Sequence, residues 1–208
     1  MNLLPYIPAE KVREFDIVLV SGTSTISTLI KEEHDPKPDL VPQSRLKWFT
    51  KSQFNHAAIA IQTKIGLMWE EALAEGVSLS DITKYCSAGS MKFHKYDGAL
   101  LMRYAGVLTS NRDRRVYPLL AGQRKAMRKR AEQLLGSKYD FLALFVGFPL
   151  MIWLKLRGLF VKTPQRWVCS STVAEIYHAA RIILVEDRNV KAVTPEDIYQ
   201  SQLLEIVE

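Results

Sequence analysis

The hydrophobic residues of this chain fall into short apolar runs bounded by turn residues, a pattern that predicts β-strands. Two of these runs flank the turn signal Ile65-Gly66 and predict a hairpin. We expect the chain to turn away from this hairpin over residues 75–77. The predicted strands are residues 15–20, 55–62, 67–74, 92–96, 99–104 and 203–207.

Other segments carry the spacing and end signals of helices. Residues 121–135 contain good helix formers with an apolar stripe, and Gly136 follows as a stop signal. A second helix is predicted over 172–180, where Thr172 and Glu175 form a capping pattern. Shorter helices are expected over 23–30, over 80–85 and from Thr194. Strands clustered in the middle of the chain with helices at the sides predict an α+β fold, in one domain spanning 1–208.

Residues 141–161 are almost wholly apolar. Their longest charge-free run, 141–154, is shorter than the roughly 20 residues that a membrane-spanning helix needs, and Pro149 interrupts it. One interpretation is that this segment packs into the core. The other is an apolar insertion that covers an acyl-binding cleft or touches a membrane surface.

The composition, with 48% hydrophobic and 24% charged residues, is that of a globular protein. Only two cysteines occur, Cys86 and Cys169, so a disulfide framework is excluded. No cysteine or histidine spacing predicts a zinc site, and we expect neither metal nor cofactor. The first ten residues lack a basic region followed by an apolar run. The sequence therefore predicts no secretory signal and a cytoplasmic protein.

The net charge is +6, and much of the excess lies in residues 112–130. Such a cluster is either the solvated face of a helix or a surface that binds phosphate. The stretch lacks the interleaved aromatic residues of a nucleic-acid stacking surface, which makes nucleic acid an unfavoured partner. Lipid head groups are the better candidate. We therefore include a peripheral membrane contact through 112–130 and 141–161 among the expectations.

Cys169 is the first candidate for chemistry. It directly precedes the predicted helix 172–180, and a helix N-terminus lowers the pKa of a thiol and offers free N–H groups to an oxyanion. A single cysteine is otherwise most simply a small buried hydrophobe. Nothing comparable surrounds Cys86.

A thiolate nucleophile needs a base, and His56 is the best placed of the four histidines. It opens an apolar strand, where an imidazole can be held rigidly beside a cleft. His178 lies nine residues beyond Cys169 on the same predicted helix and points to the opposite face.

Glu70 and Glu71 lie on the strand that should pair with the His56 strand. Adjacent strand residues face opposite sides, so only one of these carboxylates can fix the tautomer of the histidine. The other glutamate is then expected on the solvent side.

Several ordered motifs resemble those of the YiiX/YebB-like family of permuted papain-like cysteine hydrolases, which belong with the NlpC-type enzymes. The motifs are D-I-V-L-V-S-G at 16–22, N-H-A-A-I-A at 55–60, E-A followed by G-V at 71–77, L-G-S-K-Y-D at 135–140, and V-C-S at 168–170. The sequence departs from the family at Phe15, where glycine is usual, and at Ser170, where an acidic residue is common.

The resemblance implies a circularly permuted papain-like fold with a central antiparallel sheet flanked by helices. It implies a catalytic triad of Cys169, His56 and Glu71, and it selects Glu71 over Glu70. The activity implied is hydrolysis or acyl transfer through an acyl-enzyme, on a peptide or lipid-acyl amide or ester. By the same resemblance Tyr139 lies near the cleft, where its hydroxyl either contacts substrate or is satisfied within the core. The alternative is a non-enzymatic membrane- or nucleic-acid-binding module of the same fold.

Overall fold

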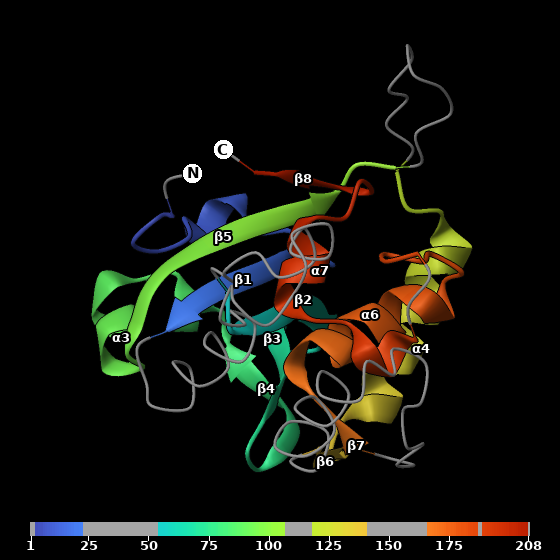
Figure 1. The fold of residues 1–208 in the computed structure, drawn as a ribbon, viewed down its shortest axis with the longest axis horizontal. Helices are drawn as coiled ribbons and strands as arrows, with labels where there is room; N and C mark the ends of the chain where they lie inside the picture. Colours follow the sequence, from blue (N-terminus) through green and yellow to red (C-terminus); the bar gives the residue numbers. More distant parts are fainter. Residues whose placement is uncertain (1–2, 23–53, 107–117, 141–165, 187–188, 208) are drawn as a thin grey trace, which may run out of the picture.

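A six-stranded antiparallel sheet forms the centre of the computed structural model, in the order β4-β3-β2-β1-β5-β8 (Figure 1). The structure describes residues 3–22, 54–106, 118–140, 166–186 and 189–207. The strands are β1 (Ile17–Gly22), β2 (His56–Thr63), β3 (Gly66–Leu73), β4 (Gly76–Asp81), β5 (Tyr96–Tyr104) and β8 (Leu204–Ile206). A separate parallel pair joins β6 (Lys138–Tyr139) to β7 (Arg166–Trp167).

Helices α4 (Ala121–Leu134) and α6 (Cys169–Ala179) pack against each other and against β2 (Figure 1). The short helix α7 (Pro195–Tyr199) also contacts α6, and α3 (Ala88–Phe93) packs against β5. Three 3-10 turns complete the description: η1 (Ala9–Lys11), η3 (Ile82–Tyr85) and η5 (Val190–Ala192). The α+β class expected from the sequence is confirmed.

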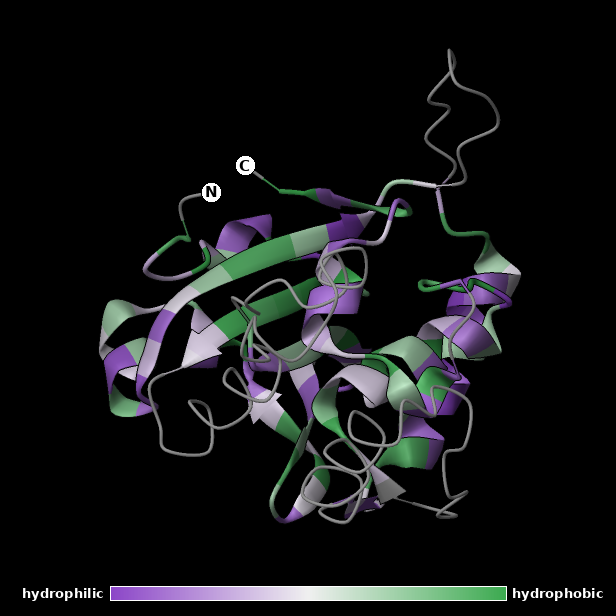
Figure 2. Cartoon of the chain, in the orientation of Figure 1, coloured by the Kyte–Doolittle hydropathy of each residue, from purple (hydrophilic) through white to green (hydrophobic). Residues whose placement is uncertain are grey.

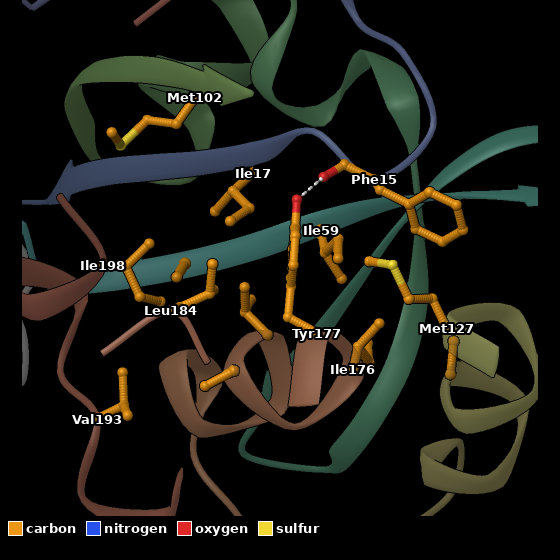
Figure 3. Packing of buried hydrophobic residues seen from close by; sticks show 14 of the residues in the cluster. Phe15, Ile17, Ile59, Met102, Met127, Ile176, Tyr177, Leu184, Val193 and Ile198 are labelled. Atoms are coloured by element: carbon orange, nitrogen blue, oxygen red, sulfur yellow. Dashed lines mark hydrogen bonds between the residues drawn. The ribbon is translucent and has the colours of Figure 1, made fainter. Parts of the chain in front are cut away.

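The central strands β1 and β2 are buried on both faces, which explains why their central residues form uninterrupted apolar runs (Figure 2). Ile17 and Ile59 point toward α6 and α4, where they lie in one cluster with Tyr177 and Met127 (Figure 3). Leu19 belongs to the same cluster. The residues between them along the strands contribute to a second core on the opposite face. Its members include Val18, Val20, Ala58, Ala60, Trp69, Tyr85 and Leu101.

Phe15 joins the start of the sheet to α6 in an unusual backbone conformation. Its φ of 73° lies in the left-handed region, which side chains with a Cβ rarely adopt. Its N–H donates to the Ala60 carbonyl at 2.7 Å, and its carbonyl accepts from the Tyr177 hydroxyl at 2.7 Å (Figure 3). These two bonds and the burial of the phenyl ring hold a conformation that favours glycine, the residue usual there in the resembling family.

The structure corrects several sequence predictions. Residues 76–81 form strand β4 where a turn and the start of a helix were expected, and 88–93 form helix α3, which takes up part of the predicted strand 92–96. Helix α6 begins at Cys169 rather than at Thr172, so Thr172 lies inside the first turn and its hydroxyl donates to the Val168 carbonyl. The predicted helix over 23–30 and the apolar segment 141–161 lie outside the described residues, and the single domain over 1–208 stays a prediction.

Candidate active site

Cys169 is the first residue of α6, and only 6% of it is exposed. The first N–H groups of a helix lack partners within the helix and carry partial positive charge. Burial alone would raise the pKa of the Cys169 thiol. A hydrogen bond with His56, the charge of His56 and the backbone amides of Ala57 and Ser170 nevertheless hold this pKa below its usual value.

His56 opens β2 and bridges Cys169 to the neighbouring strand. Its Nε2 lies 2.7 Å from Oε2 of Glu71, and its side chain is 13% exposed. Burial by itself would lower the pKa of the imidazole. The hydrogen bond with Cys169, the charge of Cys169 and the hydrogen bond with Glu71 raise that pKa well above 6.5. The arrangement therefore favours an imidazolium beside a thiolate.

Glu71 projects from β3 toward four hydrogen-bond donors. Its Oε2 accepts from His56 and from the Tyr85 hydroxyl at 2.5 Å. Its Oε1 accepts from the Ser80 hydroxyl and from Nζ of Lys84 at 2.5 Å. Although burial acts to raise it, the pKa of Glu71 lies well below its usual range because of the bonds and charges of His56 and Lys84. The carboxylate is therefore anionic and fixed in direction.

The strand register decides which glutamate reaches the histidine. In the ladder between β2 and β3, Ile59 pairs with Glu70, so Glu71 falls opposite Ala58, on the same face as His56. The expectation that Glu71 rather than Glu70 meets His56 is thus met by the geometry.

Glu70 does not lie on the solvent side, and that expectation was wrong. Its side chain is fully buried on the face that α6 covers, and among the described residues neither carboxyl oxygen has a hydrogen-bond partner. Burial raises the pKa of Glu70 to about 8. A strand covered on both faces has no solvent side, which is why the alternation argument failed here.

Tyr139 is held near Cys169 by backbone pairing rather than by a helix. In β6 it pairs with Trp167, two residues before the thiol, and β6 is anchored next to β4 where the Val77 N–H donates to the Ser137 carbonyl at 2.8 Å. Burial raises the pKa of Tyr139, and the charge on Cys169 raises it further. The predicted substrate-binding residue is thus close enough to the thiol to sense its charge.

Two aromatic residues that the sequence did not single out surround His56. Tyr96 of β5 stacks on the imidazole with ring centroids 6.4 Å apart, and the Tyr85 ring lies 6.3 Å from it. Neither residue belongs to a sequence motif that contains His56, because tertiary packing rather than sequence spacing brings η3 and β5 next to the histidine. Ser80 had a usable signal: the alternation of Val77, Ser78, Leu79 and Ser80 is that of a half-exposed strand.

The basic stretch 112–130 is partly neutralised within the chain. Arg124 and Arg128 both bind Glu14, at 2.9 Å and 2.5 Å, and Arg130 binds Glu175 at 2.7 Å. Residues 112–117 and 141–161 lie outside the described residues, so the predicted membrane contact stays a prediction. Within the described ranges, no helix combines the length and the apolarity needed to cross a membrane.

Comparison with solved structures finds the same fold in the crystal structure of metalloprotein yiiX from Escherichia coli O157:H7, a DUF1105 protein. The alignment covers 95% of this chain and 97% of that chain, with a TM-score of 0.59 and 16% sequence identity. The likeness shows a shared fold. No protein-family model matches the chain, and no curated protein matches it by sequence.

Because this structural neighbour is a metalloprotein, we asked whether the residues of the present chain fit a metal ion. The described residues contain no group of three His, Cys, Asp or Glu side chains that could hold a metal ion. At Glu71, one carboxylate oxygen is paired with the ammonium of Lys84, and the other accepts hydrogen bonds from His56 and Tyr85. The described residues therefore do not fit a metal centre.

Proposed function

We propose that this protein is a cysteine hydrolase or acyltransferase in which Cys169 is the nucleophile, His56 the general base and Glu71 the residue that orients the histidine. One observation carries the proposal. A buried thiol at a helix N-terminus interacts with a histidine whose Nε2 lies 2.7 Å from a fixed carboxylate. The order of these residues, with histidine and glutamate on strands that precede the cysteine helix, also supports a permuted papain-like arrangement.

The reaction follows from these roles. The Cys169 sulfur attacks the carbonyl carbon of an amide or ester, and the oxyanion formed is stabilised by N–H groups at the start of α6. The His56 imidazolium gives its proton to the leaving nitrogen or oxygen as the carbon–heteroatom bond breaks, which leaves a thioester on Cys169. Water, deprotonated by His56, then releases the acid. A different nucleophile in place of water gives acyl transfer.

The substrate class we propose is a peptide or a lipid-acyl amide or ester, with Tyr139 contacting the substrate beside the thiol. The effect of the Cys169 charge on Tyr139 supports its nearness to the reacting atoms. No cofactor enters this chemistry, since each proton and electron pair is supplied by the substrate, water and the three side chains.

Thiol labelling tests the proposal most directly. At about pH 6, iodoacetamide should alkylate Cys169 at least ten times faster than Cys86. The pKa of Cys86 is raised to about 11 by burial and by the charges of Glu10 and Asp81, so this residue serves as an internal control. His56→Gln should remove the difference, as followed by mass spectrometry of the labelled peptides. Equal rates in the wild type would favour the non-enzymatic binding module.

Trapping the intermediate tests the acyl-enzyme separately. Brief incubation with a p-nitrophenyl acyl ester should add one acyl mass to the intact protein, on the peptide that contains Cys169. The Cys169→Ser variant keeps the packing and should acquire a far slower or undetectable label. An acyl group found only on lysines would exclude the proposed nucleophile.

A further inference from the structure

A buried lysine shares the carboxylate that orients His56. Lys84 lies on η3, is 9% exposed, and places Nζ 2.5 Å from Oε1 of Glu71. A buried ammonium is costly unless it is paired, and Glu71 is the carboxylate with which Lys84 forms an ion pair here. Glu71 therefore faces two cationic partners at once, Lys84 on one oxygen and His56 on the other.

Lys84 is not needed to hold Glu71 in place. The hydroxyls of Ser80 and Tyr85 each donate to one carboxylate oxygen, so both oxygens have neutral donors in addition to the charged ones. The ammonium adds positive charge to a carboxylate that is already oriented. Without that charge, the full negative charge of Glu71 would act on His56 alone.

We propose that Lys84 acts through Glu71: its charge sets the net charge around the His56–Glu71 pair and thereby the pH range over which Cys169 is available as a thiolate. This inference rests on the proposed function, because it assumes that the thiolate of Cys169 matters. It adds a residue that none of the sequence motifs includes.

The sign of the effect follows from the charges that face the site. With the ammonium present, the protonated pair of Cys169 and His56 loses a proton more readily, because a nearby positive charge favours the thiolate and disfavours the imidazolium. Among the described residues, the other titratable groups that face this pair are the phenols of Tyr96 of β5, Tyr85 of η3 and Tyr139 of β6, and the charge of Asp140 acts on Tyr139. Glu71 and Lys84 are therefore the fixed charges in direct contact with the histidine or its carboxylate.

His94 provides a second place at which the same charges are felt. It stacks against Tyr96 with ring centroids 6.0 Å apart. Burial lowers the pKa of His94, and the charge of Lys84 lowers it further, whereas the charge of Glu71 raises it. A change in the charge at position 84 should therefore be visible at His94 by NMR, without any reference to thiol reactivity.

The experiment measures how the alkylation rate of Cys169 depends on pH in Lys84→Met, Lys84→Arg and Ser80→Ala. The alkylation rate should rise with pH as the Cys169 thiolate forms. The pH midpoint of that rise should be about one unit higher in Lys84→Met, because a unit charge several ångströms away at an intermediate dielectric has an effect of that size. Lys84→Arg keeps the charge and should return the midpoint to within a few tenths of the wild-type value. Ser80→Ala removes a neutral donor to the same carboxylate without changing the net charge, and its midpoint should move by less than half of the shift seen in Lys84→Met.

The controls separate charge from structure and this inference from the proposed function. Lys64→Met, at the exposed hairpin turn, should change nothing. In Lys84→Met the NMR titration of His94 should also move to higher pH. If Lys84→Met does not fold, Lys84→Gln takes its place. A shift of the alkylation midpoint in Ser80→Ala as large as that in the Lys84 variant would overturn the charge argument. An unmoved midpoint in a folded neutral variant would also overturn it, whereas a slow Cys169 in the wild type would overturn the proposed function instead.

Discussion

Replacing Glu70 by glutamine should make the stability of the protein less sensitive to rising pH. Glu70 is fully buried, and no described residue donates a hydrogen bond to either oxygen. Burial raises the pKa of this carboxyl from an ordinary value of 4.5 to about 8 in the folded state. The folded protein therefore binds a proton that the unfolded chain releases between these two values. The contribution of Glu70 is most favourable below pH 4.5 and is lost as the pH rises toward 8.

The magnitude follows from the difference between the two pKa values. Each pH unit across which only the folded state keeps the proton lowers the free energy of unfolding by about 1.4 kcal/mol. Between about pH 5 and pH 8 this loss sums to roughly 3.5 kcal/mol in the wild type, because the proton is only partly bound or released at the two ends of the interval. Glu70→Gln has nearly the same shape and does not titrate, so its stability should lack this decline. The other titratable groups are the same in both proteins, so their contributions cancel in the difference between the two free energies of unfolding.

Urea unfolding at a series of pH values measures this difference directly. The Glu70→Gln variant should be close to the wild type near pH 5 and more stable than the wild type near pH 8. Glu75→Gln, at the exposed turn between β3 and β4, is the matched control and should follow the wild type throughout. Parallel stability curves for Glu70→Gln and the wild type would refute the reasoning, since they would mean that Glu70 has a partner or reaches water.

Substitutions at two further positions test the site and the start of the sheet. Glu71→Gln should lower stability at neutral pH by about 3 kcal/mol, because it breaks a buried ion pair. Since the pKa of Glu71 is depressed in the folded state, its contribution is present above pH 4.5 and shrinks as the pH falls, so urea unfolding at pH 3 should show a smaller gap. Phe15→Ala should destabilise by about 3–5 kcal/mol through loss of the buried ring. Phe15→Gly should be about 1 kcal/mol more stable than Phe15→Ala, because φ is 73° at this position; the reverse order, found by thermal unfolding, would rule out backbone strain.

The sheet could largely be predicted from the sequence because its central strands are apolar on both faces. The runs at 15–20, 55–62 and 99–104 overlap β1, β2 and β5, and the hairpin around Ile65-Gly66 was correctly placed. Strand β4 was missed because its polar residues, Ser78 and Ser80, resemble the start of a helix when read without their alternation. Helix α3 was missed because it is short and its neighbour Tyr96 opens a strand.

The residues of the candidate site could be named from the sequence, but their electrostatic surroundings could not. Cys169, His56 and Glu71 were found through motifs and a resemblance, and the structure brings them together. Lys84 and Tyr85 reach Glu71 because η3 folds back after β4, a path set by tertiary packing rather than by spacing along the chain. Sequence periodicity predicts which face of an element a side chain occupies. It does not predict which residues of other elements pack against that face.

Glu70 and Glu71 show most clearly that the face of a strand does not by itself determine the surroundings of a side chain. They are neighbours on one strand, both are fully buried, and they differ only in the face on which they lie. On one face, four donors surround the carboxylate, and the bonds and charges of two of them, His56 and Lys84, keep the pKa of Glu71 far below its usual value. On the other, burial without a partner raises the pKa of Glu70 to about 8. Near pH 7 these two adjacent residues therefore carry one permanent carboxylate and one carboxyl that remains largely protonated. Glu71 is therefore the glutamate whose negative charge acts on His56, through the contact between its Oε2 and the histidine Nε2.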